Sequence, residues 1–528
     1  MPEQGGMDAE VEPGSDAGID PGIDPRADHG IDPSDLETCL RVLDEGGRLD
    51  ADHPDSVRLQ RAVGRLFKEV KRQRRAAAKR EKREADREVL ERTATGSAQR
   101  VDDETAGIPL VSSAPGAIAG HLTEPQDCYI CKEPYTQIDA FYHQLCPSCA
   151  AINRAKRDPE MDLRGRRALL TGGRAKIGMY IALMLLRAGA DVTITTRFPR
   201  DAARRFSRMD DYADWSDRIT VIGVDLRDPA QVTALGDTVA GDGPLDILIN
   251  NAAQTVRRSP GAYSGLVDGE TEALAGAAAD VRRISMGRSS EAHPESLAGA
   301  GGTLAALSGT VVPTVGGAVE GADCAVPAAP ASPAERLATD ALRAGSALPE
   351  RIAAGTAVDA GGLLPDVVHT NSWVQTVEQI APLEMLEVQL CNSVAPFILL
   401  SRLRPALEAS TARRKYVVNV SAMEGVFSRR YKGPGHPHTN MAKAGLNMLT
   451  RTSAAELYEK GILMTAVDTG WITDERPHTT KTRLADEGFR APLDLVDGAA
   501  RVVDPIVRGE AGEDVYGVFL KDFEMYPW

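Results

Sequence analysis

The pattern of residues along the chain changes at Arg166, and this change constrains the fold more than any other feature. From there on, short β-branched runs alternate with stretches of helical periodicity. Such alternation is typical of a parallel sheet whose strands are joined by crossover helices. The predicted strands are Ala168 to Leu170, Asp191 to Thr195, Thr220 to Val224, Ile247 to Ile249, Tyr416 to Val420, Met464 to Val467 and Tyr516 to Leu520. We therefore predict a three-layer α/β domain over 160–528 with a doubly wound parallel sheet of Rossmann type.

One long stretch, 257–368, interrupts this alternation and is rich in Ala, Gly, Ser and Pro. Structureless loops of this length are uncommon inside compact domains, so we interpret the stretch as an insertion that contains one helix over 333–344. It follows the fourth strand and therefore starts at the carboxyl edge of the sheet, where such folds bind ligands. A lid over the substrate and a disordered expansion are both compatible with this composition.

The residues before the α/β domain divide into a tail and a helix. Between Met1 and Asp35 there are ten acidic residues, one arginine and three copies of Gly-Ile-Asp-Pro. Such a segment buries too little apolar surface to order itself, so we expect a disordered acidic tail over 1–55. Apolar residues at helical spacing then predict a charged helix over 56–93. Its stretch from Lys68 to Arg83 carries nine Lys or Arg and two Glu, which is typical of a solvated face.

The overall charge and the lack of targeting segments narrow the class of protein. The formal net charge of −15 argues against a nucleic-acid partner for the whole chain. Uninterrupted apolar runs are shorter than a membrane span, and the acidic start does not resemble a signal peptide, so we expect no membrane partner and a cytoplasmic location.

Four of the seven cysteines form two Cys-x-x-Cys pairs separated by 14 residues, within the segment 120–157. They are Cys128, Cys131, Cys146 and Cys149. Each pair can direct two thiolates at one ion, and two pairs complete a tetrahedral shell. We predict a small N-terminal module with a structural zinc ion, with iron as the alternative metal. Cys39, Cys324 and Cys391 stand alone, which fits a reducing compartment.

The sharpest local signal is TGGRAKIG, which directly follows the first predicted strand and leads into an apolar helix. Backbone N–H groups and the helix dipole at such a turn favour a phosphate. This turn, NNAA at 250–253, NVSAMEG at 419–425 and Lys443 in MAKAGL come in the order found in the short-chain dehydrogenase/reductase family, which the chain resembles over about 163–528. The resemblance implies a nicotinamide dinucleotide cofactor and a small-molecule substrate.

The resemblance also implies the positions that hold the cofactor. They are Thr171, Gly172, Gly173, Arg174, Lys176, Ile177 and Gly178 in the turn, Thr196, Arg197, Asp225, Asn250 and Ala252 beside the adenosine, and Lys443 and Thr473 beside the nicotinamide ribose and carboxamide. Lys176 replaces a usual glycine, so it either touches the pyrophosphate or reshapes the turn. Thr196 and Arg197 replace the usual acidic residue and its neighbour. Because a guanidinium accepts a 2′-phosphate, NADP is favoured over NAD, which remains possible.

The catalytic set of the family is only partly present. Asn392 and Lys443 match two of its four members, but Thr439 stands in place of the tyrosine and Ala422 in place of the serine. We predict an oxidoreductase that reduces a carbonyl or oxidises an alcohol, with a non-standard proton donor. The candidates come from the preceding loop, YKGPGHPHTN, and are Tyr431, His436 and His438. The alternative is a domain that binds NADP without turning it over and acts as a sensor or scaffold.

Family members commonly pair through the helices that carry the asparagine and the lysine. The resemblance therefore implies a homodimer or homotetramer, with apolar faces formed by Leu399, Leu400, Leu403, Leu446, Leu449 and Leu457.

Overall fold

The computed structural model describes residues 30–98, 100, 110–286, 332–342, 349–366, 368–429, 431–472 and 475–528. The chain divides into two compact units, Met1–Lys82 and Arg83–Trp528. The first unit contains helix α1 (Pro33–Gly46) and most of helix α2 (Pro54–Glu91). The helix expected over 56–93 corresponds to α2.

The expectation of disorder over 1–55 is wrong for its second half, because α1 lies there. The Asp32 carboxylate caps this helix by accepting hydrogen bonds from the backbone N–H groups of Ser34 and Asp35, and Pro33 occupies the first turn. Proline at this position costs no hydrogen bond, and an aspartate cap stabilises a helix by about 1 kcal/mol. The local signals for a helix start therefore outweigh the acidic composition. Residues 1–29 lie outside the described residues.

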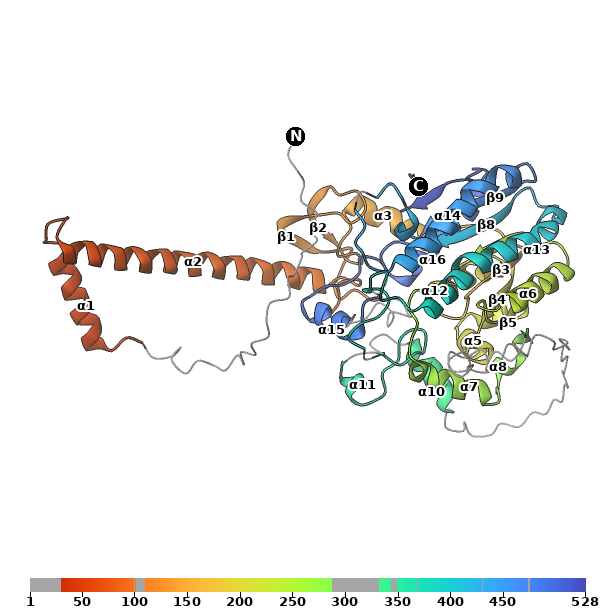
Figure 1. Cartoon of the computed structure of the whole chain (residues 1–528), viewed down its shortest axis with the longest axis horizontal. Coiled ribbons are helices and arrows are strands. Elements are labelled where there is room, and N and C mark those ends of the chain that lie inside the picture. The colour runs from red at the N-terminus through yellow and green to blue at the C-terminus, as the bar shows by residue number, and fades with distance from the viewer. Residues whose placement is uncertain are drawn as a thin grey trace. The chain divides into compact units, whose positions relative to one another are not determined.

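The second unit is built around a nine-stranded sheet (Figure 1). Its strands are β3 (Arg167–Leu170), β4 (Asp191–Thr196), β5 (Ile219–Gly223), β6 (Ile247–Asn250), β7 (Arg282–Ser285), β8 (Lys415–Ser421), β9 (Ile462–Asp468), β10 (Phe519–Lys521) and β11 (Glu524–Tyr526). Their order is β11-β10-β9-β8-β6-β3-β4-β5-β7, and every neighbouring pair except β10 and β11 is parallel. The predicted mostly parallel Rossmann-type sheet is confirmed, and the strand order reverses direction between β3 and β6.

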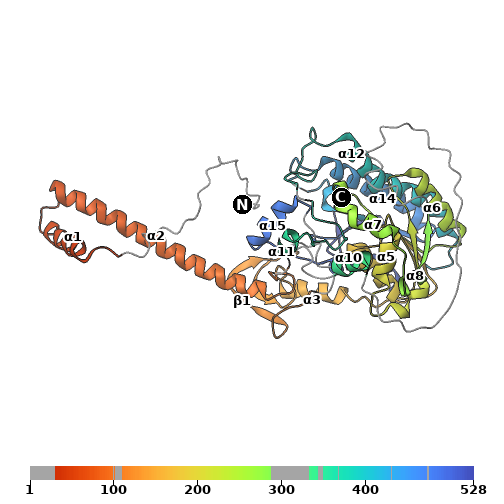
Figure 2. The same ribbon diagram turned by 90° about the horizontal axis from the view of Figure 1, so that it is seen from below.

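Helices cover both faces of the sheet and bury a separate apolar core on each. One core contains α4 (Lys176–Arg187), α5 (Pro199–Phe206) and α16 (Leu495–Glu510). The other contains α6 (Pro229–Gly241), α13 (Ala395–Ala409) and the second half of α14 (Pro437–Tyr458), as Figure 2 shows from below. The remaining helices are α7 (Ser264–Thr271), α8 (Ala277–Asp280), α10 (Pro333–Ala341), α11 (Pro349–Ala353), α12 (Pro382–Gln389) and α15 (His478–Asp486).

The leucines expected to form an oligomer face are instead part of this core. Leu399, Leu403, Leu446 and Leu457 are buried within the chain, because α13 and α14 pack against the sheet and against α6. The same two helices expose other large apolar side chains, Phe397, Met441 and Met448. The homo-oligomer stays a prediction, and its interface would use these residues rather than the leucines.

Helix α12, a π-helical turn at Leu390–Val394 and α13 form one continuous helical segment, Pro382–Ala409. By length and composition alone this segment is apolar enough to cross a membrane. We expected no such segment, because uninterrupted apolar runs in the chain are shorter than a membrane span. Leu399, Leu403 and Leu407 are completely buried against α6 and the sheet, which is the environment of a core helix.

The insertion over 257–368 is partly integrated into the sheet. Strand β7 lies within it and pairs in parallel with β5, so the insertion extends the sheet by one edge strand. The sequence analysis missed this strand, because its residues, RRIS, are charged and mostly exposed. The helix expected over 333–344 is α10, which starts with a capping box formed by Ser332 and Glu335. Residues 287–331 lie outside the described residues.

The segment with the four cysteines forms a small module that we call the cysteine module (residues 110–157). It consists of an antiparallel hairpin, β1 (Ile118–Asp127) and β2 (Pro134–Asp139), followed by helix α3 (Pro147–Lys156). At its end, the Arg157 guanidinium donates to the carboxylates of Asp494 and Asp497 at the start of α16, at 2.6 and 2.9 Å. Both aspartates are buried.

Candidate active site

The TGGRAKIG turn connects the carboxyl end of β3 to α4 at the point where the strand order reverses. Ligands of doubly wound sheets bind at this place. The Thr171 hydroxyl fixes the turn by accepting hydrogen bonds from the backbone N–H groups of Asn251 and Ala252, both at 3.0 Å. The Asn251 side chain donates in turn to the carbonyls of Thr171 and Gly172, each at 3.1 Å. The β3 turn and the β6 turn therefore form one rigid edge.

Two glycines of this turn are required by its geometry. Gly172 has a φ of 70°, in the left-handed region. At Gly178, a Cβ atom would lie only 2.0 Å from the Gly172 carbonyl oxygen. The first turn of α4 therefore packs against the Gly172 carbonyl too closely for any side chain at position 178. Because no side chain covers them there, the backbone N–H groups of this turn stay open to a ligand.

Lys176 replaces the middle glycine of the family pattern and has a backbone conformation that glycine favours. Its φ is 55°, in the left-handed region that glycine adopts at no cost. Its ammonium lies 3.6 Å from the carboxylate of Asp359, which belongs to the end of the insertion. The Lys176 ammonium therefore has a protein partner, and its contact with a pyrophosphate stays a prediction.

Asp359 belongs to a buried turn over residues 359–363, which we call the strap. The strap contacts the glycine-rich turn through Arg174, whose guanidinium donates to the Gly361 carbonyl at 2.7 Å and also pairs with Asp201. Arg205 donates to the Ala360 carbonyl at 2.7 Å. The side chains of Arg174 and Lys176 are thus both engaged by protein groups, and the part of the turn left to bind a phosphate is its backbone. No sequence pattern predicted the strap.

On the adenosine side, Arg197 follows β4 and lies beside two aromatic rings that stack on each other, Phe198 and Tyr263. Its guanidinium carbon is 5.5 Å from the ring centre of Phe198 and 5.0 Å from that of Tyr263, which comes from the insertion. Thr196 is buried, and its hydroxyl accepts a hydrogen bond from the Phe198 N–H at 3.0 Å. The insertion therefore contributes directly to this side of the site, and sequence reasoning missed Tyr263.

The other expected adenosine-side residues lie at the same edge, but their polar groups have protein partners. The Asp225 carboxylate accepts hydrogen bonds from the backbone N–H and the guanidinium of Arg227. The same guanidinium also donates to Glu387 at 3.3 Å. The amide of Asn250 donates to Asn419 at 2.8 Å. Ala252 contacts the glycine-rich turn through its backbone N–H.

Asn392 and Lys443 lie at the carboxyl edge on the β8 side. The buried Asn392 side chain accepts from the Gln254 N–H at 2.7 Å and donates to the Gln254 carbonyl at 2.9 Å, which the π-helical turn allows. The Lys443 ammonium donates to the Val420 carbonyl at 2.8 Å. Burial lowers the pKa of Lys443 to about 8. Thr439 lies one turn earlier on α14, buried, and its hydroxyl has no hydrogen-bond partner among the described residues.

The candidate proton donors differ in their access to this site. Tyr431 is 63% exposed, whereas His438 is 3% exposed and adjacent to Thr439 in the first turn of α14. Within the part of the chain that the structure describes, the His438 ring faces the backbone of Thr255, and no side chain hydrogen-bonds to its ring nitrogens. Burial lowers the pKa of His438 from its ordinary value. His436 stacks on Trp373, with ring centres 4.0 Å apart, and is thereby fixed.

Asp468 is a further ionisable residue at this edge that sequence reasoning missed. It ends β9, opposite Ser421 of β8, and is buried. Burial raises the pKa of Asp468 to about 6. An aspartate directly after an apolar strand was the available signal. Thr473, expected beside the nicotinamide, lies outside the described residues.

The four cysteines lie close together, as the sequence predicted. Their sulfur atoms are all within 4.8 Å of one another, and those of Cys131 and Cys146 are 3.7 Å apart. A tetrahedral zinc–thiolate site places its sulfurs about 3.8 Å apart, so the arrangement fits such an ion. The Cys146 N–H also donates to the Cys128 sulfur at 3.3 Å, which stabilises a thiolate.

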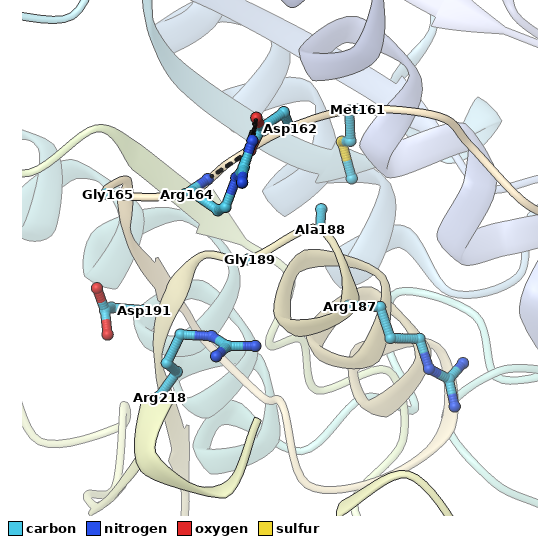
Figure 3. Close-up of a pocket in the computed structure, with 9 residues that line it drawn as sticks. All are labelled: Met161, Asp162, Arg164, Gly165, Arg187, Ala188, Gly189, Asp191 and Arg218. Atoms are coloured by element: carbon cyan, nitrogen blue, oxygen red, sulfur yellow. Dashed lines mark hydrogen bonds and ion pairs between the residues drawn. The ribbon is translucent and has the colours of Figure 1, made fainter. Parts of the chain in front are cut away.

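Figure 3 shows a separate pocket of about 630 Å³ at the opposite edge of the sheet, near the amino ends of β3 and β4. It is lined by Met161, Asp162, Arg164, Gly165, Arg187, Ala188, Gly189, Asp191 and Arg218. Its arginines already have protein partners: Arg164 pairs with Asp162, Arg187 with Asp211, and Arg218 with the Leu186 carbonyl. The pocket is therefore not part of the candidate active site.

Comparison with known proteins is consistent with this geometry. Residues 166–266 match the family described as short chain dehydrogenase. An uncharacterised protein of Acanthamoeba polyphaga mimivirus is 30% identical over 401 residues, which cover 73% of this chain and 72% of the viral protein. A probable oxidoreductase of Streptomyces antibioticus is 42% identical over 92 residues, which cover 17% of this chain and 30% of that protein.

Among solved structures, the NADPH-bound carbonyl reductase from chicken fatty liver is 17% identical, with a TM-score of 0.37, and the match covers 69% of this chain and 100% of that one. The family match falls on β3 to β6 and the glycine-rich turn, and the other family blocks follow at the same edge of the sheet. The chain thus contains a short-chain dehydrogenase domain, whose family model matches residues 166–266.

Proposed function

We propose that the protein is an NADP-dependent oxidoreductase that transfers a hydride between the coenzyme and a carbonyl or alcohol substrate. The observation that carries this proposal is the position of Asn392 and the buried Lys443 at the same sheet edge as the glycine-rich turn. Backbone N–H groups of that turn would hold the pyrophosphate, and Lys443 would hold the ribose next to the nicotinamide. The bound coenzyme supplies the hydride, and the protein orients both reactants and provides a proton.

Preference for NADP over NAD would come from Arg197. In an Arg197→Met variant, the Kd for NADP should rise about 10- to 100-fold, because a charge-assisted contact with the 2′-phosphate is lost. The Kd for NAD should change little. Isothermal calorimetry with both coenzymes measures this, and Arg187→Met, at the opposite edge of the sheet, is the matched control. Equal affinities of the wild type for NADP and NAD would contradict the preference.

We further propose that His438 supplies the proton in place of the family's tyrosine. Reduction then consists of hydride transfer to the carbonyl carbon and proton transfer from the imidazolium to the oxygen. His438 is buried beside Thr439 and faces two other ionisable groups, since Glu384 favours its charged form and His436 opposes it. Because its pKa lies below 6.5, the imidazolium is the minor form at neutral pH, and reduction should slow about tenfold per pH unit above that pKa.

The test is the oxidation of NADPH with a panel of ketones and aldehydes between pH 5 and 8. His438→Phe should lower kcat/KM at least 100-fold and flatten its pH profile. The exposed Tyr431 provides the control, as Tyr431→Phe should retain full activity. An unchanged rate in His438→Phe would remove this residue as the donor. Tight NADPH binding without any oxidation by the panel would instead support the sensor or scaffold alternative.

We propose that the cysteine module holds one structural zinc ion through Cys128, Cys131, Cys146 and Cys149. The support is the sulfur spacing, which matches a tetrahedral all-thiolate shell. Four protein ligands leave no position for substrate, so this ion would stabilise the module and take no part in the chemistry.

A further inference from the structure

Tyr129 of the cysteine module contacts the carboxyl edge of the sheet, where ligands bind in such folds. We propose that Tyr129 is a positioning residue for the turn Gly470–Ile472, so that the metal-loaded module sets the affinity for the nicotinamide half of the coenzyme. This inference rests on the proposed function.

Tyr129 lies between two of the cysteines, directly after Cys128 and two residues before Cys131. Its hydroxyl accepts a hydrogen bond from the backbone N–H of Trp471 at 2.9 Å. Ammonium groups lie near its ring, that of Lys132 at 5.2 Å and that of Lys521 at 5.8 Å from the ring centre. The ring is therefore held by the module and by β10, and its hydroxyl is directed at the turn that follows β9.

Among the described residues, the turn Gly470–Ile472 also contacts Leu493. The Trp471 carbonyl accepts a longer hydrogen bond, 3.3 Å, from the Leu493 N–H. Gly470 has a φ of 81°, and a Cβ atom there would lie 2.5 Å from a Leu493 methyl group. Ile472 is buried in the apolar core that also contains Cys128, Cys146 and Cys149. The cysteine module thus contributes polar support to this turn through Tyr129, and it shares the apolar support with Leu493 and with Phe489, whose ring centre lies 5.1 Å from that of Trp471.

The turn directly follows the carboxyl end of β9, which β8 and β6 separate from β3 and the glycine-rich turn, and so lies at the carboxyl edge where ligands bind. The adenosine side lies on the other side of the point where the strand order reverses. There, Arg197 follows β4 and Tyr263 comes from the insertion. A loss of support from Tyr129 should therefore weaken contacts with the nicotinamide half alone. A general destabilisation would weaken both halves.

The experiment compares two probes in calorimetry with the zinc-loaded full chain: NADP, and adenosine 2′,5′-bisphosphate, which lacks the nicotinamide half. Tyr129→Phe keeps the ring and removes the acceptor for the Trp471 N–H. We expect its Kd for NADP to rise about three- to tenfold, with the Kd for the bisphosphate within twofold of the wild type. Zinc content should stay unchanged.

Tyr135→Phe is the matched control, since the Tyr135 hydroxyl bonds only within the module, to Gln126 and to the His143 carbonyl. Both Kd values should stay at the wild-type level in this variant. As a second measurement, the Trp471 amide should exchange its hydrogen faster in Tyr129→Phe than in Tyr135→Phe.

An equal rise of both Kd values in Tyr129→Phe, or no rise for NADP, overturns the positioning role. Failure of the proposed function has a different signature, since wild-type protein would then bind the bisphosphate and NADP equally weakly or not at all.

Discussion

Replacing Lys443 with methionine is expected to lower kcat/KM for NADPH-dependent reduction by about 10²- to 10⁴-fold and, at the same time, to make the protein more stable. The loss of activity follows from the proposed role, since this ammonium would hold the ribose and assist the proton transfer beside Thr439. The gain in stability follows from its burial. Burial lowers the pKa of Lys443 to about 8, so the folded state binds the proton less tightly than the unfolded chain does.

Lys443 also makes the free energy of unfolding of the wild type depend on pH in a defined direction. Between about pH 8 and 10.5 the unfolded chain carries more protons at this position, so the free energy of unfolding of the wild type rises with pH in that window. Below pH 8 the folded state bears a constant penalty on the order of 3 kcal/mol. Methionine removes the penalty but leaves the Val420 carbonyl without its donor, which costs about 1 kcal/mol. The Tm at pH 7 should therefore rise by a few degrees.

Differential scanning calorimetry between pH 6 and 10, together with steady-state kinetics, measures both effects. Lys415→Met is the matched control: Lys415 is also buried, but it starts β8 at the far edge of the sheet and donates to the Lys460 carbonyl. Activity should survive this control. Full activity in Lys443→Met would contradict the proposed site.

A second large effect is expected when Cys128 and Cys146 are both replaced by serine. These two sulfurs are buried in the module's core, and an all-thiolate zinc site of this kind contributes on the order of 10 kcal/mol to folding. The variant should lose its metal and lower the Tm by more than about 10 °C, or fail to fold. Elemental analysis of protein purified under reducing conditions should find about one zinc ion per wild-type chain.

The exposed Cys39 in α1 provides the control, since Cys39→Ser should keep both metal and Tm. Where the double variant does not fold, chelator titration of the wild type gives the same information, with loss of near-ultraviolet circular dichroism as the signal. Iron in place of zinc would be visible in the absorption spectrum. Wild-type protein that holds neither metal and keeps its full Tm would refute the site.

The sequence predicted the elements whose residues carry a strong local pattern. Strands β3 to β6, β8 and β9 are apolar runs buried on both faces, so their burial and their pattern agree. Strand β7 has no such pattern, because its RRIS sequence pairs at an exposed sheet edge. Leu399 and Leu403 illustrate the opposite difficulty, since an apolar helix face fits a dimer interface as well as the chain's own core.

The candidate site was predicted wherever a residue type and its spacing define the chemistry, as for the glycine-rich turn, Asn392, Lys443 and the four cysteines. Contacts made by distant segments were not predictable. Tyr263 and Asp359 come from an insertion with no readable pattern, and both reach the site only through tertiary folding. Tyr129 likewise has no signal that links it to Trp471, more than 300 residues away.

The ion pairs of Arg157 have a consequence for how this chain can be divided. A shortened chain that begins after Arg157 would keep every strand of the sheet, yet it would lack the guanidinium that pairs with Asp494 and Asp497 and the Tyr142 hydroxyl that donates to Asp497. The start of α16 would then lose the hydrogen bonds that hold it against the cysteine module and would be opened to solvent. We therefore expect the shortened chain to be less stable than the full one.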